Sequence, residues 1–91
     1  MSFNIIFTGR FKQDYKTIKK RGYPLNKMEV VFKSIIEFEP LSPKYKVHKL
    51  SGDYSDCWEC HILPDWLLIW RVDEKTKELH FIRTGTHSDL F

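Results

Sequence analysis

The sequence predicts an α+β protein in which an N-terminal strand and a helical hairpin pack on a twisted, mainly antiparallel sheet, in the order β-α-α-β-β-β-β. Two patterns favour this fold class. Apolar residues recur at helical spacing within residues 8–38, and after residue 44 they form short extended runs separated by turn-forming residues. The 91 residues are 42% hydrophobic, which suffices for one compact domain over residues 1–91.

The first two elements are a strand and a helix. The β-branched and aromatic run FNIIF predicts a strand at residues 3–7. Thr8 is placed to cap the helix that follows, and Gly22 is placed to end it. The narrow apolar stripe of this helix recurs at i, i+4 and i+7 and consists of Phe11, Tyr15 and Ile18. Its opposite face is strongly positive and carries Lys12, Lys16, Lys19, Lys20 and Arg21.

A second helix completes the hairpin. Pro24 stands where the first helical residue is expected, and the two prolines of EPLSP (residues 39–43) end the helix. Its wide buried face is expected to consist of Leu25, Met28, Val31, Phe32, Ile35 and Ile36.

The extended runs after residue 44 predict consecutive antiparallel strands: YKVHKL, YSDCWECHIL, WLLIWRV and ELHFIRTG. The turn-like segments SGD, PD and DEKTK separate them. Both faces of WLLIWRV are apolar, which is typical of a central strand covered by helices on one side and by other groups on the opposite side.

The formal charge of +3 is unevenly distributed along the chain. Residues 1–50 hold eleven Lys and Arg against four acids (+7), whereas residues 51–91 hold four against eight (−4). A basic N-terminal half suits a polyanion such as nucleic acid, although a solvated helical surface explains the same pattern. Because neither a run of about 18 apolar residues nor an export signal is present, we expect a cytoplasmic protein without a membrane segment.

The pentapeptide C-x-x-C-H at residues 57–61 is the attachment motif of a c-type haem and resembles half of a zinc site. In a strand its side chains alternate, so that Cys57, Glu59 and His61 face one side and Cys60 faces the other. The two cysteine Cα atoms would then lie about 10 Å apart, which is too far for a disulfide. We therefore expect no haem, metal or other cofactor, and we interpret Cys60 as a small buried hydrophobe.

Several titratable side chains fall near the expected strand ends: His48, His61, Asp65, Arg83 and His87. Histidine exchanges protons near neutral pH, so two imidazoles and an arginine that holds a phosphate suffice for metal-free cleavage of RNA. Each histidine taken alone is better explained as an ordinary surface or core residue. The catalytic interpretation depends on their convergence in the fold.

Three motifs in the C-terminal half occur in the order found in a known family. They are H-K-L-x-G-x-Y, E-C-H-I-x-P-D-W-L-L-I and R-T-G-T-H-S-D-L-F, within residues 48–91. The chain thus resembles the YafQ branch of the RelE-like toxins, the ribonucleases of type II toxin-antitoxin systems, and residues 1–47 agree through the strand and hairpin. The resemblance implies a RelE-like fold and an endoribonuclease that cuts mRNA in the ribosomal A site without metal.

The same resemblance implies site residues and partners. It implies catalytic residues at His48, His61, Asp65, Arg83, His87 and Phe91 and an RNA-binding residue at Trp66. We further expect Lys46 and Lys49 to bind RNA. A cognate antitoxin would silence the toxin, in a heterotetramer that contacts promoter DNA only through the antitoxin. The ribosome and mRNA would be its targets.

The roles within this site are expectations of the same kind. His87 would be the general acid, and Arg83 would bind the scissile phosphate. One of the other two histidines, or Asp65, would serve as the base or orient it. Trp66 would stack on an RNA base or pack in the core, and Phe91 would close the site.

One departure from the family pattern bears on activity. Cys57 and Trp58 stand where an aromatic-Arg pair usually precedes Glu-Cys-His, which removes a positive charge near the substrate. The alternative function is a catalytically weak RNA- or ribosome-binding module, or a degenerate toxin that acts with an antitoxin as a repressor. A haem or metal protein is the third interpretation.

Overall fold

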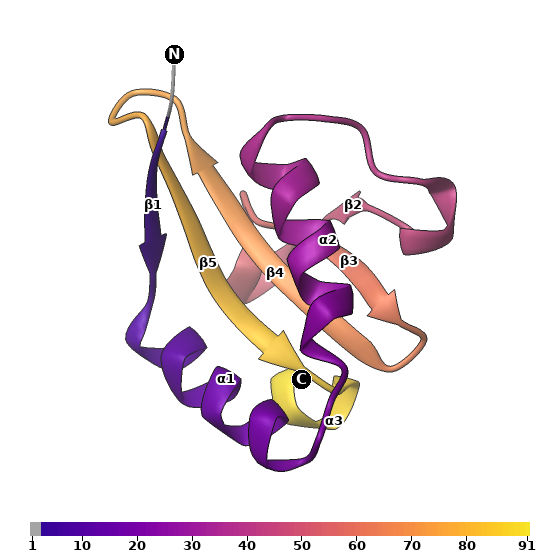
Figure 1. Ribbon diagram of the computed structural model, residues 1–91. Helices are drawn as coiled ribbons and strands as arrows, with labels where there is room; N and C mark the ends of the chain where they lie inside the picture. The colour runs from indigo at the N-terminus through magenta and orange to yellow at the C-terminus, as the bar shows by residue number, and fades with distance from the viewer. Residues whose placement is uncertain (1–2) are drawn as a thin grey trace.

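The computed structural model describes residues 3–91, and Figure 1 shows how their elements are arranged. The elements in chain order are β1 (Asn4–Phe7), α1 (Gly9–Lys20), α2 (Leu25–Ile36), η1 (Pro43–Tyr45), β2 (His48–Lys49), η2 (Gly52–Tyr54), β3 (Trp58–Leu63), β4 (Trp66–Asp73), β5 (Glu78–Gly85) and α3 (His87–Leu90). The two η elements are single turns of 3₁₀ helix. None of these helices is long and apolar enough to cross a membrane.

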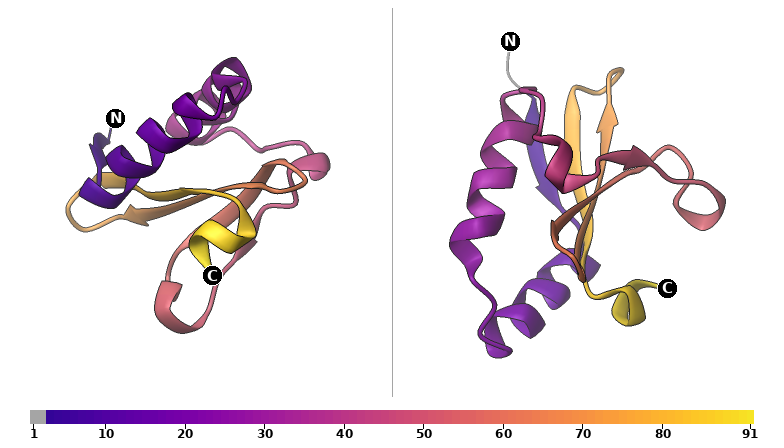
Figure 2. Two further views of the ribbon diagram at one scale, coloured as in Figure 1. Left: turned by 90° about the horizontal axis from the view of Figure 1, so that it is seen from below. Right: turned by 90° about the vertical axis from the view of Figure 1, so that its right-hand side faces the viewer.

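The strands form one mixed sheet in the order β1-β5-β4-β3-β2. The neighbours from β2 to β5 pair antiparallel, as expected, whereas β1 pairs parallel with β5. Both long helices cover one face of this sheet, and α3 lies on the opposite face together with the loop before β3 (Figure 2). The α+β fold class predicted from the sequence is confirmed.

β4 is the central strand, and its side chains serve two separate cores. Trp66, Leu68 and Trp70 belong to the larger cluster, which the helices cover with residues such as Phe11 and Met28. The alternate side chains, Leu67 and Ile69, belong to a smaller cluster with Cys57 and Leu90 on the opposite face. Because successive side chains of a strand point to opposite faces, a strand apolar throughout must be covered on both sides.

α1 begins where its capping residue predicts. The Thr8 hydroxyl accepts the backbone N–H of Phe11 at 3.0 Å, which satisfies a donor that the first helical turn leaves free. After α1 the chain turns at Gly22, whose φ of +78° favours glycine. The predicted buried residues Phe11 and Ile18 are buried.

α2 differs from the prediction in two details. Pro24 is the residue before the helix rather than its first helical residue. Ile36 is 41% exposed, because it follows Ile35 and is therefore turned about 100° away from the buried face. The buried positions are Met28, Val31 and Ile35.

The C-terminal half is less extended than predicted. Within YKVHKL only His48 and Lys49 are strand, because residues 43–45 form a 3₁₀ turn that Pro43 begins and the Ser42 hydroxyl caps. YSDCWECHIL is strand only from Trp58, and the segment before it contains a second 3₁₀ turn at residues 52–54. These turns interrupt the hydrogen bonding between strands, so the strand predicted from YKVHKL is reduced to the two-residue edge strand β2.

After the last predicted strand the chain ends in a short helix that the sequence analysis did not predict. α3 begins after Thr86, whose hydroxyl accepts the backbone N–H of Asp89, while the Asp89 carboxylate accepts the backbone N–H of Thr86. This reciprocal capping box stabilises a helix start. His87 is consequently presented by a helix and not by β5.

Candidate active site

Three imidazoles from distant parts of the chain lie side by side. The ring centroids of His48 and His61 are 6.2 Å apart, and those of His61 and His87 are 5.7 Å apart. His48 lies on β2, His61 on β3 and His87 on α3. The convergence on which the catalytic interpretation depends is therefore present in the fold.

Backbone carbonyls orient two of these rings. Nδ1 of His48 lies 2.7 Å from the carbonyl oxygen of Lys46, and Nδ1 of His61 lies 3.2 Å from that of Pro64. A carbonyl oxygen only accepts, so each Nδ1 carries a hydrogen and each Nε2 remains for other partners. His48 and Glu59 are directly opposite each other in the antiparallel pairing of β2 with β3.

Glu59 is a site residue that the sequence reasoning did not select. Its Oε1 lies 3.1 Å from His48 Nε2 and 4.0 Å from His61 Nε2, and the residue is 4% exposed. Its Oε2 is buried and has no hydrogen-bond partner among residues 3–91. The sequence did indicate part of this arrangement, because strand alternation places Glu59 and His61 on one face. That Glu59 also lies beside His48 depends on the register between β2 and β3, which the sequence does not reveal.

Asp65 orients His87. Its Oδ1 accepts two hydrogen bonds from this residue, from the backbone N–H at 3.0 Å and from ring Nδ1 at 2.6 Å. These hydrogen bonds, the backbone one first, lower the pKa of Asp65, which therefore stays a carboxylate near neutral pH. Because Nδ1 of His87 is engaged, Nε2 is the ring nitrogen left for another partner.

Arg83 occupies a different position from the one expected of a phosphate ligand. It is buried, and its guanidinium donates to the Asp14 carboxylate at 2.6 Å from Nε and 3.1 Å from Nη2. Longer contacts reach the Tyr54 hydroxyl and the Asp89 carbonyl oxygen. The hydrogen bonds with Asp14 raise the pKa of Arg83. The structure thus joins Arg83 to α1 and α3, and phosphate binding by Arg83 stays a prediction.

A second ion pair anchors α3 to α1. Arg21 donates to both carboxylate oxygens of Asp89, at 2.6 and 3.1 Å. Gly85, with φ of +154°, precedes α3, and a Cβ there would lie 2.9 Å from Asp89 Oδ2. Asp89 and Arg21 therefore position the helix that carries His87, and no local sequence signal pairs two residues this far apart.

The other predicted site residues lie in diverse environments. Phe91 is 65% exposed, and its ring lies 5.6 Å from that of Tyr54. Trp66 is 1% exposed, and its indole N–H donates to the Thr84 hydroxyl at 2.9 Å, so it packs in the core and offers no ring face for a base. Lys49 extends over the exposed ring of Trp58, with Nζ 5.8 Å from the centroid.

The cysteines of C-x-x-C-H do not form a site. Cys57 and Cys60 are both buried, and they pack in the clusters on opposite faces of the sheet. Burial raises the pKa of Cys60 to about 12, so its thiol stays protonated. This arrangement agrees with the expectation that Cys60 is a buried hydrophobe.

A metal ion would find its ligands elsewhere. One ligand atom from each of His48, Glu59 and His61 can be chosen so that all three lie within 4.8 Å of one another. Two imidazoles and a carboxylate are a common ligand set for zinc.

Comparison with known proteins matches this chain over nearly its whole length. Residues 3–91 match the family described as the bacterial toxin of type II toxin-antitoxin system, YafQ. The mRNA interferase toxin YafQ of Escherichia coli strain K12 is 36% identical over 89 residues, which cover 97% of this chain and 95% of the relative.

Solved structures agree in fold. A crystal structure of YafQ from E. coli strain BL21(DE3) is similar with a TM-score of 0.91 and 34% identity, covering 98% of both chains. YafQ in the crystal structure of the E. coli DinJ-YafQ toxin-antitoxin complex is similar with a TM-score of 0.90 and 35% identity, covering 100% of this chain and 99% of that one. The chain therefore belongs to the YafQ family of toxins of bacterial type II toxin-antitoxin systems and is a homologue of its mRNA interferases.

Proposed function

We propose that this mRNA interferase homologue cuts mRNA in the ribosomal A site, only on the ribosome, by acid–base catalysis that needs no metal ion. The observation that carries the proposal is the convergence of three imidazoles, two of which lie beside the buried carboxylate of Glu59. General acids and bases must lie within hydrogen-bond reach of the groups that exchange protons. A cluster of four such groups supplies both roles for one phosphodiester.

The proposed reaction is an in-line displacement within the RNA. A base removes the proton from a ribose 2′-OH, and the oxygen attacks the adjacent phosphorus. The bond from phosphorus to the 5′-oxygen breaks, and an acid protonates that oxygen, leaving a 2′,3′-cyclic phosphate and a 5′-hydroxyl. Each proton transfer contributes about 10²- to 10⁴-fold.

The positions of the side chains support particular roles. We assign the acid to His87, because Asp65 holds Nδ1 and leaves Nε2 to donate. Glu59 or His61 takes the proton of the 2′-OH, and His48 stabilises the charge that develops on the phosphate. Phe91 lies at the exposed end of the same helix, where it can cover the bound nucleotide.

A substitution of His87 tests this assignment. Cleavage of mRNA in a purified translation reaction should fall by about 10²-fold or more for His87→Ala. His80→Ala is the matched control, because His80 pairs with Glu78 on β5 outside the cluster. The reaction is repeated without ribosomes, where no cleavage is expected. Undiminished cleavage by His87→Ala would remove His87 from the chemistry, and equal cleavage of free mRNA would end the ribosome-dependent part of the proposal.

We also propose an antitoxin partner. A relative of this chain is seen in complex with the antitoxin DinJ. For the present protein we infer a small dimeric antitoxin with an acidic, partly disordered arm that folds against the basic toxin. The expected heterotetramer would contact promoter DNA through the antitoxin alone. Co-expression with the neighbouring gene product, followed by measurement of the mass of the complex, tests this stoichiometry.

The alternative function is a ribosome-binding module with little catalysis. It is favoured by Trp58, which stands where the family pattern has arginine, and by the engagement of Arg83 with Asp14. Growth distinguishes the two functions. Arrest on induction of the wild-type protein, relieved by His87→Ala, supports the nuclease, whereas unaffected growth and intact messages support the binding module.

A further inference from the structure

A groove of about 630 Å³ opens beside the histidine cluster. Its walls come from the first turns of α2, from η1 and the residue after it, and from the end of β3 with the turn that follows. A space of this volume is within the range that holds a small organic ligand or a nucleotide.

The chemistry of the groove is basic and partly aromatic. Lys27, Lys44 and Lys46 line it, and none of its lining residues within the described chain is acidic. Tyr45 lies between two of these lysines in sequence, and Lys44 Nζ is 5.1 Å from the centroid of its ring. Cations beside an exposed aromatic or apolar surface are the means by which proteins hold single-stranded nucleic acid. Val30, which is 58% exposed, adds apolar surface to the wall.

The groove is continuous with the cluster described above. His61 belongs to both, because it lines the groove and lies beside His48 and His87. Lys46, which also lines the groove, holds the ring of His48 through its carbonyl oxygen. A polymer whose phosphate is placed between these histidines therefore has an open path into the groove.

We propose that this groove binds the part of the RNA strand next to the scissile phosphate, with Lys27, Lys44 and Lys46 on backbone phosphates and a base against Tyr45. The proposal rests on the proposed nuclease function for the identity of the strand. An acidic protein segment would have the same negative charge as RNA. Only RNA, however, is covalently continuous with a phosphate placed at His61, so the continuity of the groove with the cluster favours RNA.

The test uses a short RNA of mixed sequence that is 2′-O-methylated at every ribose and therefore cannot be cleaved. Its affinity for the full-length protein is measured by fluorescence anisotropy over a range of salt concentrations. The variant Lys27→Ala/Lys44→Ala should bind about tenfold more weakly at moderate salt. The slope of log K against log salt should become shallower by about 1.4, since each phosphate contact on single-stranded RNA contributes about 0.7.

A matched control removes two positive charges elsewhere. Lys33→Ala/Lys75→Ala changes exposed lysines that do not line the groove and leaves the same net charge. Its salt slope should stay that of the wild type. Tyr45→Ala should weaken binding with no change of slope, because it removes stacking and no charge. The unfolding temperature of each variant is measured alongside.

Three results would overturn the proposal that the groove binds RNA. The first is an equal loss of RNA affinity in both double variants, and the second is a wild-type protein that does not bind the RNA oligomer. The third is a Lys27→Ala/Lys44→Ala variant that loses affinity for the antitoxin but not for the oligomer. Binding of the oligomer requires no cleavage, so the two proposals fail separately. If the wild-type protein binds the oligomer through the groove but cuts no mRNA, only the nuclease proposal fails. If the Lys27→Ala/Lys44→Ala variant cuts and binds like the wild type, only the groove proposal fails.

Discussion

Glu59 is held in a position that is costly for a carboxylate. It is 4% exposed, and its Oε2 has no hydrogen-bond partner within residues 3–91, while its Oε1 lies at ion-pair distance from His48. A buried polar atom without a partner costs about 1 to 3 kcal/mol of folding stability. A buried carboxylate with an unpartnered oxygen beside two imidazoles indicates a functional role, because buried polar atoms in folded proteins are otherwise almost always paired.

Replacing Glu59 separates these two effects. Glu59→Gln should reduce the rate of mRNA cleavage by about 10²-fold or more if the carboxylate takes part in proton transfer. The free energy of unfolding should stay constant or rise, because the substitution removes a buried charge while its partner His48, whose side chain is 46% exposed, stays accessible to water. Cleavage assays and urea unfolding of the same preparation measure both quantities.

Glu78→Gln is the control for that experiment. Glu78 lies 3.1 Å from His80, the same separation as between Glu59 and His48, but on β5 away from the cluster. It should leave cleavage unchanged. Equal losses in the two variants would show that any broken carboxylate–imidazole pair lowers activity through the fold.

The same residues predict inhibition by a transition metal ion. Zn²⁺ bound by His48, Glu59 and His61 would occupy groups that the proposed reaction uses, so micromolar zinc should stop cleavage and a chelator should restore it. Binding is measured without catalysis from the absorption spectrum of added Co²⁺. His48→Gln should abolish the spectrum and His80→Gln should retain it; an unchanged spectrum in His48→Gln would place the ion elsewhere.

α3 shows how a short element is made rigid enough to hold His87, the proposed general acid. A helix of four residues has no stability of its own in water. Its capping box, the Arg21–Asp89 pair and the contact of Arg83 with the Asp89 carbonyl oxygen tie it to α1 and β5. Asp89 takes part in all three arrangements, so the position of His87 depends on it.

Asp89 should make the protein sensitive to acid. Its hydrogen bond with Arg21, and then the one from the Thr86 backbone, hold the pKa of Asp89 well below its ordinary value of 3.8. A carboxyl whose pKa is lowered by folding stabilises the folded state above its unfolded pKa and loses that contribution as the pH falls. We expect the free energy of unfolding to decline below about pH 4.

The variant Asp89→Asn tests the cause. It should cost about 0.5 to 2 kcal/mol at pH 7, the usual range for a lost cap, and should show a smaller decline between pH 5 and pH 3 than the wild type. Urea unfolding at these pH values measures the difference. Asp53→Asn, in the exposed 3₁₀ turn before β3, is the control and should keep the wild-type decline. If the free energy of unfolding of Asp89→Asn declines as much as that of the wild type, other carboxyl groups cause the acid sensitivity.

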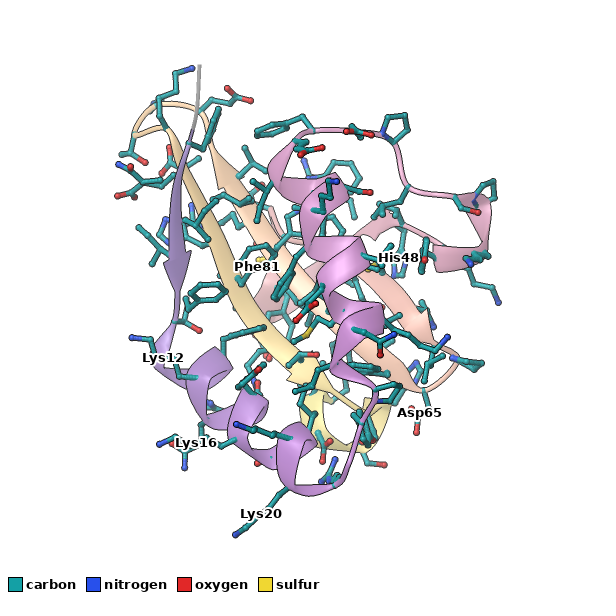
Figure 3. All side chains as sticks on the ribbon, viewed as in Figure 1. Lys12, Lys16, Lys20, His48, Asp65 and Phe81 are labelled. Carbon is teal, nitrogen blue, oxygen red and sulfur yellow. The ribbon has the colours of Figure 1, made fainter. Side chains whose placement is uncertain are left out.

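At the scale of the whole molecule, the lysines of α1 lie on a surface away from the histidines. Figure 3 shows Lys12, Lys16 and Lys20 extending outward from α1, far from His48 and Asp65. Under the proposed function, cations placed this way would hold ribosomal RNA while the cluster faces the message. Binding through phosphate contacts releases counterions, so it weakens as the salt concentration rises.

Association with the ribosome should therefore depend on salt through α1. Sedimentation with ribosomes should fall steeply between low and moderate salt for the wild-type protein. The variant Lys12→Ala/Lys16→Ala/Lys20→Ala should show a slope shallower by about 0.7 to 0.9 for each lost phosphate contact. A slope that does not change would mean that another surface contacts the ribosome.

Much of this molecule follows from patterns that are local in the sequence. The period of Phe11, Tyr15 and Ile18 predicted α1, Thr8 predicted its start, and the two apolar faces of WLLIWRV predicted the central strand. Each signal lies within one element, because the burial of a helix or strand repeats with its own geometry. The short 3₁₀ turns and α3 were missed because hydrogen bonds of a few residues outweigh the extended pattern there.

By itself, the sequence determined the order of the elements, which faces are apolar, the family and the histidines of the candidate site. Only the tertiary structure decided that β1 pairs with β5, that Glu59 lies between His48 and His61, and that Asp14 holds Arg83. Asp14 and Arg83 are 69 residues apart. The physical reason is that a periodic pattern reports which side of an element is buried, whereas a hydrogen bond between distant residues depends on the register and packing of the whole sheet.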